Sequence, residues 1–413
     1  MLKIALLSTG EEVLHGDIVD TNAAWLSQQM FEQGFSICKR STVGDEIGSL
    51  TEELVMLSFN SDIVIVNGGL GPTSDDLSTE AAGRASEQPL VLFDEWFEHM
   101  KAFFQKRGKE MPDCNRKQAM LPKGAEIIHN PIGTACGFKL QLNDCIFYFT
   151  PGVPKEFKLM VTEQIIPDLR RNYPNVTGLE CSKLYTFGTS ESALSEKLDK
   201  VQLPDGYTIG YRCYLPFIEV KLFGPKNQLQ VRLKVLDILL SLINQHVVSI
   251  DETMQERVAH LIEDKGYSIS TAEQSTYGML SQWLHTFPKA ANYCGHGWIL
   301  GDSVNVGDEL TDSLASALAL AAATRDKCST DIAIVTGKVI EKVSSVVIAV
   351  PEGEWGQTVT FKGEYAQEDR STLITTLAAD MIRRYLTSQI MFPEYGVFTR
   401  NKEIFIPRTM IAD

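Results

Sequence analysis

Hydrophobic and polar positions follow two different periods along the first 170 residues. Short runs rich in Val, Ile and Leu predict strands, and longer stretches with apolar residues three or four apart predict helices. Strands are predicted over residues 3–8, 36–42 and 62–66, and helices over residues 21–34 and 46–58. This alternation predicts a parallel sheet covered by helices, which places the domain in the α/β class. Ligands bind such sheets where strands end and helices begin.

The same periods predict the rest of the first domain, which we expect to cover residues 1–171. Further helices are predicted over residues 78–87, 94–107, 113–120 and 155–171. Short strands are predicted near residues 125–128, 136–142 and 145–149.

A change of pattern separates the remaining chain into three regions. Residues 172–250 read as a small α+β module with strands over residues 181–187, 207–213 and 217–223 and helices over residues 190–200 and 226–246. Residues 251–390 alternate again, with helices over residues 251–265, 278–286, 308–325 and 366–386 and strands over residues 267–272, 293–300, 331–335 and 344–350. Residues 391–413 lack a helical period and read as an extended tail.

Charge narrows the range of partners. The formal net charge is −15 and the pI is about 5.0, which argues against general binding to nucleic acid or to an anionic membrane. Small phosphorylated substrates are still compatible, because they need only local positive potential. The most apolar helical stretch, residues 313–323, is shorter than a membrane span requires. Eight scattered cysteines without a CxxC pair predict reduced thiols in a cytoplasmic protein.

The loop at residues 67–76 carries the strongest chemical signal. Gly68, Gly69 and Gly71 follow a buried strand and allow a tight turn close to a ligand. Such a loop before a helix directs backbone N–H groups at an anion, typically a phosphate. Asp75 and Asp76 would repel a phosphate unless a cation lies between them. The loop therefore predicts a phosphate or pyrophosphate site bridged by a metal, and Thr73 and Ser74 are expected to cap the helix that follows.

Five sequence blocks in the first domain resemble the CinA family and the wider molybdopterin-binding fold. These blocks are Ser8–Glu12 with Gly16–Asn22, Asn67–Asp76, Asn115–Pro122, Asn130–Phe138 and Pro151–Phe157. Cys136 stands where the family usually has Pro. The resemblance implies a three-layer molybdopterin-binding-like domain. It also implies metal-dependent hydrolysis of ADP-ribose, or a related nucleoside diphosphate, to AMP and ribose 5-phosphate.

This resemblance gives each conspicuous residue an expected role. Gly68, Gly69, Gly71 and Thr73 would hold the phosphates, and Asp75 and Asp76 would carry Mg²⁺, Co²⁺ or Ni²⁺, with K⁺ as a further candidate cofactor. Other expected ligand contacts come from Gly10, Glu12 and Asn22, and positive charge for the phosphates from Arg116, Lys117 and Lys155. Simpler readings stay open: the aspartates favour a helix N-terminus, Glu12 and Asn22 are local caps, and Arg116 and Lys117 form a solvated helix face.

The third region resembles the C-terminal NMN amidohydrolase domain of CinA proteins, with important departures. Residues 271–278 match the family's Ala-Glu-Ser-Cys-Thr-Gly-Gly block, but Gln274 replaces the presumed nucleophilic Ser, Ser275 replaces Cys and Tyr277 replaces Gly. A block around residues 295–308 lacks the family's Lys, and the family's loop after Thr336 looks deleted. A carboxamide cannot replace a hydroxyl nucleophile, so we expect this domain to be inactive.

The middle module resembles the KH-like linker domain of CinA proteins through residues 186–192. It has no GxxG loop with basic flanks, so RNA binding is not expected. We expect it to contribute to a homodimer, as the resemblance implies. Two alternatives to ADP-ribose hydrolysis remain: NMN amidohydrolase activity that is retained despite the substitutions, and a non-catalytic nucleotide or molybdopterin sensor.

Overall fold

The computed structural model describes residues 2–301, 303–304, 306–307 and 312–410. The chain forms two compact units. The first runs to Glu180 and includes Pro225–Asn227, and the second holds Cys181–Gly224 and the chain from Gln228 onward. The middle module and the C-terminal region therefore share one compact unit, although each has its own sheet. The division of residues 1–390 into three domains stays a prediction.

The first unit is built on a six-stranded sheet in the order β2-β1-β3-β8-β7-β6. The four parallel strands are β2 (Ile37–Val43), β1 (Ile4–Thr9), β3 (Ile63–Asn67) and β8 (Cys145–Thr150). Two antiparallel strands, β7 (Gly137–Leu142) and β6 (Glu126–Ile128), complete it. The predicted parallel sheet is thus confirmed for its first four strands.

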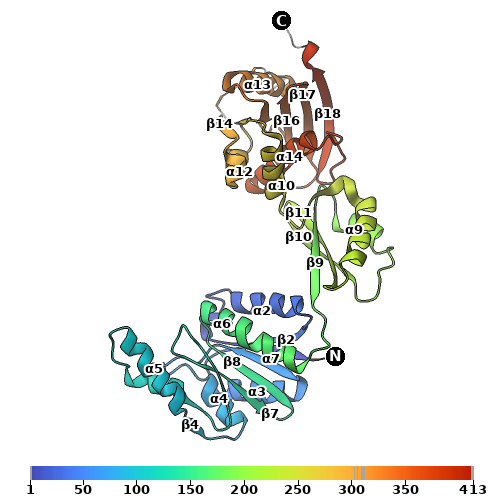
Figure 1. Cartoon of the computed structure of the whole chain (residues 1–413). Coiled ribbons are helices and arrows are strands. Elements are labelled where there is room, and N and C mark those ends of the chain that lie inside the picture. Colours follow the sequence, from blue (N-terminus) through green and yellow to red (C-terminus); the bar gives the residue numbers. More distant parts are fainter. Residues whose placement is uncertain (1, 302, 305, 308–311, 411–413) are drawn as a thin grey trace. The chain divides into compact units, whose positions relative to one another are not determined.

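Alternation along β1 explains the layers on the two faces of this sheet. Ile4 and Leu6 pack with one set of helices and Ala5 and Leu7 with another, because successive side chains of a strand point to opposite faces. The first set is α2 (Thr21–Glu32), α6 (Pro154–Met160) and α7 (Ile166–Asn172), and the second is α3 (Ile47–Asn60), α4 (Ser78–Ala85) and α5 (Asp94–Lys106) (Figure 1).

Two predicted helices of this unit differ from expectation. The helix predicted over residues 155–171 is divided by a π-helical turn at Val161–Ile165. The helix predicted over residues 113–120 is a 3₁₀ helix, Asp113–Ala119. Two elements were not predicted, the short helix α1 (Glu11–Leu14) and a small sheet of β4 (Leu90–Leu92) and β5 (Met120–Pro122).

The second unit contains two sheets. The smaller has the order β10-β11-β9-β12, with strands β10 (Thr208–Tyr214), β11 (Phe217–Pro225), β9 (Leu179–Phe187) and β12 (Val247–Ile250). Its helices are α8 (Glu191–Leu198) and α9 (Leu229–Ile243). The strand β12 was not predicted; it pairs antiparallel to β9.

The larger sheet of this unit has the order β14-β13-β15-β16-β17-β18. Its strands are β14 (Cys294–Ile299), β13 (Ile269–Glu273), β15 (Ile332–Thr336), β16 (Val343–Val350), β17 (Gly353–Phe361) and β18 (Phe398–Pro407). Its helices are α10 (Met254–Lys265), α11 (Met279–His285), α12 (Pro288–Ala291), α13 (Ser313–Cys328) and α14 (Gln367–Leu386). The helix predicted over residues 308–325 begins at Ser313; residues 308–311 lie outside the described residues.

The reading of residues 391–413 as a separate extended tail is wrong for most of that segment. β18 pairs antiparallel with β17 along its whole length, so it is the edge strand of the larger sheet (Figure 1). The strand β17 was itself not predicted.

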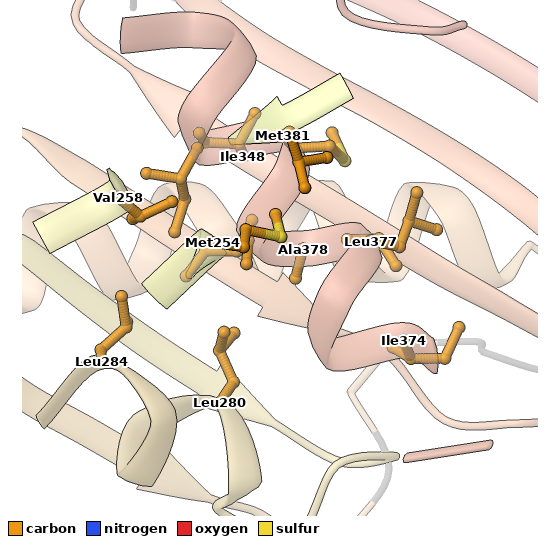
Figure 2. Packing of buried hydrophobic residues seen from close by; sticks show 14 of the residues in the cluster. Met254, Val258, Leu280, Leu284, Ile348, Ile374, Leu377, Ala378 and Met381 are labelled. Atoms are coloured by element: carbon orange, nitrogen blue, oxygen red, sulfur yellow. The ribbon is translucent and has the colours of Figure 1, made fainter. Parts of the chain in front are cut away.

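Helix α14 is buried on every side from Leu373 to Arg384. Its apolar side chains meet β16 and the helices α10 and α11 in one cluster (Figure 2). The cluster includes Met254, Val258, Leu280, Leu284, Ile348, Ile374, Leu377, Ala378 and Met381. Among the described residues, we find no helix with the length and apolar character needed to cross a membrane.

Candidate functional site

A pocket of about 420 Å³ lies at the carboxyl ends of β1, β3 and β8. Each of these strands is followed by residues that line it: Thr9, Gly10 and Glu12 after β1, Gly68–Gly71 after β3, and Pro151–Val153 after β8. The expectation that the loops after parallel strands meet at one edge of the sheet is therefore confirmed.

Two glycines of the loop after β3 are needed for its close packing. Gly68 and Gly69 have φ angles of 110° and 67°, which L side chains rarely adopt. A Cβ added at Gly68 would lie 2.8 Å from the carbonyl oxygen of Thr9, and one at Gly69 would lie 2.3 Å from the hydroxyl of Ser78. Because Gly68 and Gly69 have no side chains, the loop can pack directly against β1 and the start of α4.

A carboxylate organises the outer part of this loop. Asp76 accepts hydrogen bonds from the backbone N–H of Thr73, at 2.9 Å, and from the Thr73 hydroxyl. The prediction that Thr73 and Ser74 cap the next helix is wrong, because α4 begins at Ser78 and no side chain caps its first turn. Ser78 instead donates to the carbonyl oxygen of Gly68 at 2.8 Å. The N–H of Thr73 is therefore engaged by Asp76.

Carboxylates gather around the glycine loop. The five that line the pocket are Glu12, Asp45, Asp75, Asp76 and Glu156. Burial raises the pKa of Asp45, and the negative charges of Glu12, Asp75 and Glu11 raise it further, although the N–H of Glu11 acts in the opposite direction. A hydrogen bond from Thr73 and the charge of Lys117 lower the pKa of Asp75. The pocket is thus rich in negative charge that is only partly offset.

Two of the lining carboxylates were not singled out in the sequence. Asp45 follows the end of β2, so it could have been found from the rule that parallel strands end at one edge of the sheet. Glu156 is on the first turn of α6. The buried side chain of Asn130 donates to Glu156 at 2.7 Å and accepts from the N–H of Gly133 at 3.1 Å, so Glu156 is held in place.

Five predicted ligand contacts are not part of the pocket lining, as far as the structure describes it: Asn22, Thr73, Arg116, Lys117 and Lys155. Asn22 is buried in α2, where its amide group donates to the carbonyl oxygen of Gly152 at 2.8 Å and to Asn67 at 3.2 Å. Arg116 lies over the ring of Phe97, and Lys155 is exposed on α6. In these positions Asn22 joins the ends of β3 and β8 rather than contacting a ligand directly.

Lys117 has a structural contact that explains its place beside the loop. Its ammonium group donates to the carbonyl oxygen of Thr73. Gln118, which lines the pocket, donates to the carbonyl oxygen of Leu70 at 3.2 Å. The 3₁₀ helix that carries both residues therefore holds the glycine loop from outside.

The second candidate site, at the end of β13, is built around a buried carboxylate. Glu273 accepts from the backbone N–H groups of Gly278 and Leu280, both at 3.0 Å, and of Ser281 at 2.7 Å. It also accepts from the hydroxyl of Thr276 at 2.5 Å. The three N–H groups belong to the start of α11, where a helix leaves its backbone donors without internal partners. Glu273 is thus fully used in fixing the turn between β13 and α11.

The residues at the presumed nucleophile position are both buried. The amide nitrogen of Gln274 lies 3.3 Å from the carbonyl oxygen of Val304. The hydroxyl of Ser275 has no hydrogen-bond partner among the described residues. Tyr277 is half-exposed with a φ of 50°, a left-handed conformation that suits the Gly of the family block.

The connection after β15 is short, as predicted. Gly337–Lys342 joins β15 to β16, and Ile340 pairs with Val343 within it. The Lys-free block expected around residues 295–308 is described only in part, because residues 302, 305 and 308 lie outside the described residues.

Comparison with known proteins identifies relatives that match almost the whole chain. Residues 5–171 match the family described as a probable molybdopterin binding domain. A CinA-like protein of Escherichia coli (strain SMS-3-5 / SECEC) is 39% identical over 398 residues, which are 96% of this chain and 97% of the relative. The chain belongs to the CinA-like family. The same identity and coverage relate it to the NMN amidohydrolase-like protein YfaY of E. coli (strain K12).

Solved structures match parts of this CinA-like chain. The protein CinA with unknown function from Thermoplasma acidophilum is 26% identical, with a TM-score of 0.37, and covers 41% of this chain and 96% of its own. A competence-damaged protein (CinA) superfamily protein from Enterobacter cloacae is 16% identical, with a TM-score of 0.28, and covers 32% of this chain and 89% of its own.

A divalent metal, which the CinA resemblance implies, can be tested against the carboxylates of the pocket. Within the part of the chain that the structure describes, no three His, Cys, Asp or Glu side chains converge closely enough to hold an ion by themselves. However, Mg²⁺ usually takes only one or two protein carboxylates and completes its shell with substrate phosphates and water. The crowding of Glu12 and Asp75 around Asp45 fits such an ion, since it would offset their repulsion.

Proposed function

We propose that the N-terminal pocket hydrolyses the diphosphate of ADP-ribose, or of a related nucleoside diphosphate, with the help of a divalent cation. The observation that carries the proposal is the meeting of a phosphate-type glycine loop and five carboxylates in one pocket. A diphosphate could not enter among these carboxylates unless a cation accompanied it. Carboxylates of this kind are therefore expected for a metal-bridged diphosphate and not for a plain phosphate site.

The reaction consumes one water. Its oxygen forms a bond to one phosphorus, the bond between that phosphorus and the bridging oxygen breaks, and AMP and ribose 5-phosphate leave. In the proposed arrangement the N–H groups of Gly69 and Gly71 hold the phosphate oxygens. Glu156, which Asn130 holds in place, accepts the proton of the attacking water. Lys117 keeps the loop in register through Thr73.

Glu12 and Asp75 are the side chains that would hold the cation, with substrate phosphates and water completing its shell. Mg²⁺, Co²⁺ and Ni²⁺ are the candidates, with K⁺ as a further candidate cofactor. Bound there, the ion would neutralise charge that develops on the bridging oxygen. Asp76 is the least available of the predicted ligands, because Thr73 already donates twice to one of its oxygens.

Substitution of the carboxylates tests this proposal. In Asp75→Asn and Glu12→Gln, we expect AMP formation from ADP-ribose to fall by about 10- to 100-fold, the usual range for weakened metal binding. Calorimetric titration with Mn²⁺ should show weaker binding in the same variants. Glu98→Gln, at an exposed position on α5, is the matched control and should keep both properties. Normal hydrolysis in Asp75→Asn with unchanged Mn²⁺ binding would remove the metal role.

For the C-terminal domain, we propose that NMN is not hydrolysed. Support comes from Gln274 at the nucleophile position and from a Ser275 hydroxyl that has no hydrogen-bond partner among the described residues. Loss of the nucleophile in a serine hydrolase costs about 10⁶ in rate in a well-studied example. Nicotinic acid mononucleotide formed from NMN would contradict this part and restore the amidohydrolase alternative. Binding of ADP-ribose without turnover would favour a non-catalytic sensor.

The proposal has two further parts. A homodimer is expected from the family resemblance, and light scattering at micromolar concentration tests it, since a monomeric mass would contradict it. Cytoplasmic location is expected because all eight cysteines are free, which suits a reducing compartment.

A further inference from the structure

A second cavity, of about 600 Å³, lies in the C-terminal part of the chain and shares no lining residue with the N-terminal pocket. Four aromatic residues line it: Trp355 on β17, Tyr385 at the end of α14, Phe392, and Phe405 on β18. β17 lies three strands from β13, so Trp355 is on the order of 14 Å across the sheet from Glu273 at the usual strand spacing. None of the residues of the Glu273 turn takes part in its lining.

The aromatic walls are held in a fixed arrangement. Trp355 stacks on Phe405 with ring centroids 4.1 Å apart and meets Phe392 edge to face at 5.7 Å. Tyr385 stacks on Tyr267 at 6.1 Å, and its hydroxyl donates to Glu352 at 2.8 Å. Part of this aromatic surface is open to solvent, because Phe405 is 38% exposed and Ile390 beside it is 79% exposed.

The charged groups that line the cavity are one guanidinium and two carboxylates. Arg384 also lines it, but its three nitrogens donate to Asp380 at 2.6 Å, to the carbonyl oxygen of Ile390 at 3.1 Å and to that of Gln245 at 2.8 Å. Its guanidinium is therefore already used by the protein. The other charged lining groups are the carboxylates of Glu352 and Glu403.

These two carboxylates differ in their partners. Glu403 forms an ion pair with Arg400 at 2.6 Å. Glu352 accepts from Tyr385, and among the described residues no basic side chain lies within ion-pair distance of it. The cavity therefore combines aromatic faces with the carboxylate of Glu352, which has no basic partner within ion-pair distance among the described residues; aromatic faces beside a carboxylate favour a cation attached to an aromatic ring.

We propose that this cavity binds a small aromatic cation, a flat ring that carries one positive charge. The ring packs among Trp355, Phe392 and Phe405, and the charge pairs with Glu352. The cavity volume lies within the range of small-molecule sites, which are mostly apolar with a few convergent polar groups. The proposal is independent of hydrolysis in the N-terminal pocket.

Titration of the full-length protein with three probes tests the proposal. Tryptamine carries a ring and a positive charge, indole-3-propionate carries the ring with a negative charge, and propylamine carries the charge without the ring. We expect tryptamine to bind, by calorimetry or by shifts of NMR signals from residues 385–405, and the other two to bind at least about tenfold more weakly. No binding of tryptamine up to about 10 mM overturns the proposal.

Two variants locate the site. Phe405→Ala and Glu352→Gln change exposed residues, and each should weaken tryptamine binding by about five- to tenfold. Phe59→Ala, at an exposed position of α3, and Glu368→Gln, at the start of α14, are the matched controls and should bind like wild type. Equal binding in all four variants, or equal binding of indole-3-propionate, overturns the proposal. A dimer that dissociates in Ile390→Asp, without tryptamine binding in wild type, would show that a second copy of the chain covers this surface instead.

Discussion

One carboxylate oxygen of Asp76 lies 2.9 Å from the backbone nitrogen of Thr73 and also accepts the hydroxyl of that residue. This closes the outer turn of the glycine loop, so Asp76 has a structural contact as well as a place in the pocket. Its two roles can be separated by substitution, because Asn keeps an acceptor oxygen for Thr73 and loses the charge.

We expect Asp76→Asn to lower ADP-ribose hydrolysis by about 10- to 100-fold while the urea midpoint of unfolding stays close to wild type. The variant loses the negative charge of Asp76, which helps to hold the cation. It keeps the oxygen that accepts from Thr73, so the turn of the loop is preserved. Thr73→Ala is the companion variant, since it removes the hydroxyl and keeps the carboxylate. Hydrolysis by Asp76→Asn at the wild-type rate would leave only the structural role of Asp76.

Tyr277 carries a local strain that a glycine would relieve. Its φ of 50° is unfavourable for an L residue by roughly 1–2 kcal/mol. The greater entropy of Gly in the unfolded chain opposes part of this gain, so we expect Tyr277→Gly to raise the free energy of unfolding by at most about 1 kcal/mol in urea titrations. Tyr365→Gly, at a Tyr that is not among the left-handed residues of the structure, should instead be destabilising. A loss of stability in Tyr277→Gly would mean that its side chain makes contacts that outweigh the strain.

Glu273 is predicted to be essential for the fold of the C-terminal sheet and not for catalysis. Its buried carboxylate accepts three backbone N–H groups and a hydroxyl. Glu273→Gln should lower the free energy of unfolding by about 2–4 kcal/mol, because a neutral amide accepts fewer of these bonds and adds unpaired donors.

The control is a second buried glutamate of the same sheet. Burial raises the pKa of Glu354, which means that its charged form is disfavoured in the folded protein. Glu354→Gln should therefore leave the free energy of unfolding at pH 7 close to the wild-type value. If Glu273→Gln and Glu354→Gln lowered the free energy of unfolding equally, the capping role of Glu273 would be contradicted.

The buried ion network of α14 predicts how stability depends on pH. Burial alone would raise the pKa of Asp380, but the charges of Arg383 and Arg384 and a hydrogen bond from Tyr395 outweigh it and hold the pKa below its ordinary value of 3.8. A carboxyl group with a lowered folded pKa contributes stability above its unfolded pKa, and that stability is lost as the pH falls through the folded value.

We therefore expect the difference in unfolding free energy between wild type and Asp380→Asn to be constant from about pH 7 to pH 5 and to shrink below about pH 4. Removal of one partner from a buried network of this kind costs about 3–5 kcal/mol. Urea titrations at several pH values measure the difference. A difference that grows as the pH falls would contradict the sign of the pKa shift.

Local patterns predicted β3 from its continuous apolar run and missed two strands that carry more polar residues, β17 and β18. The run from Ile63 to Val66 is continuously apolar because helices cover both sides of β3, and its identification as a buried strand is confirmed. β17 was missed because Glu354, Gln357 and Thr358 are polar although they are buried. β18 was missed because an edge strand exposes polar residues, as at Arg400–Glu403, and only its pairing with β17 defines it.

The candidate site shows the same limit. Gly10, Glu12 and the loop from Gly68 to Asp76 could be placed together because each follows a predicted parallel strand. Asp45 was not singled out, since locally it reads as part of a turn before a helix, and its place in the pocket depends on the pairing of β2 with β1. Arg116 and Lys155 were assigned from charge alone, and charge does not tell which way a side chain on a helix points.

The central claim is that the N-terminal pocket is active and the C-terminal nucleophile position is not. The most direct measurement incubates the full-length protein with ADP-ribose and, separately, with NMN, each with Mg²⁺, Co²⁺ or Ni²⁺ plus K⁺, and resolves the products by chromatography. The account predicts AMP and ribose 5-phosphate from ADP-ribose in the presence of metal and no change in NMN. Nicotinic acid mononucleotide formed from NMN, or intact ADP-ribose under every metal, would contradict it.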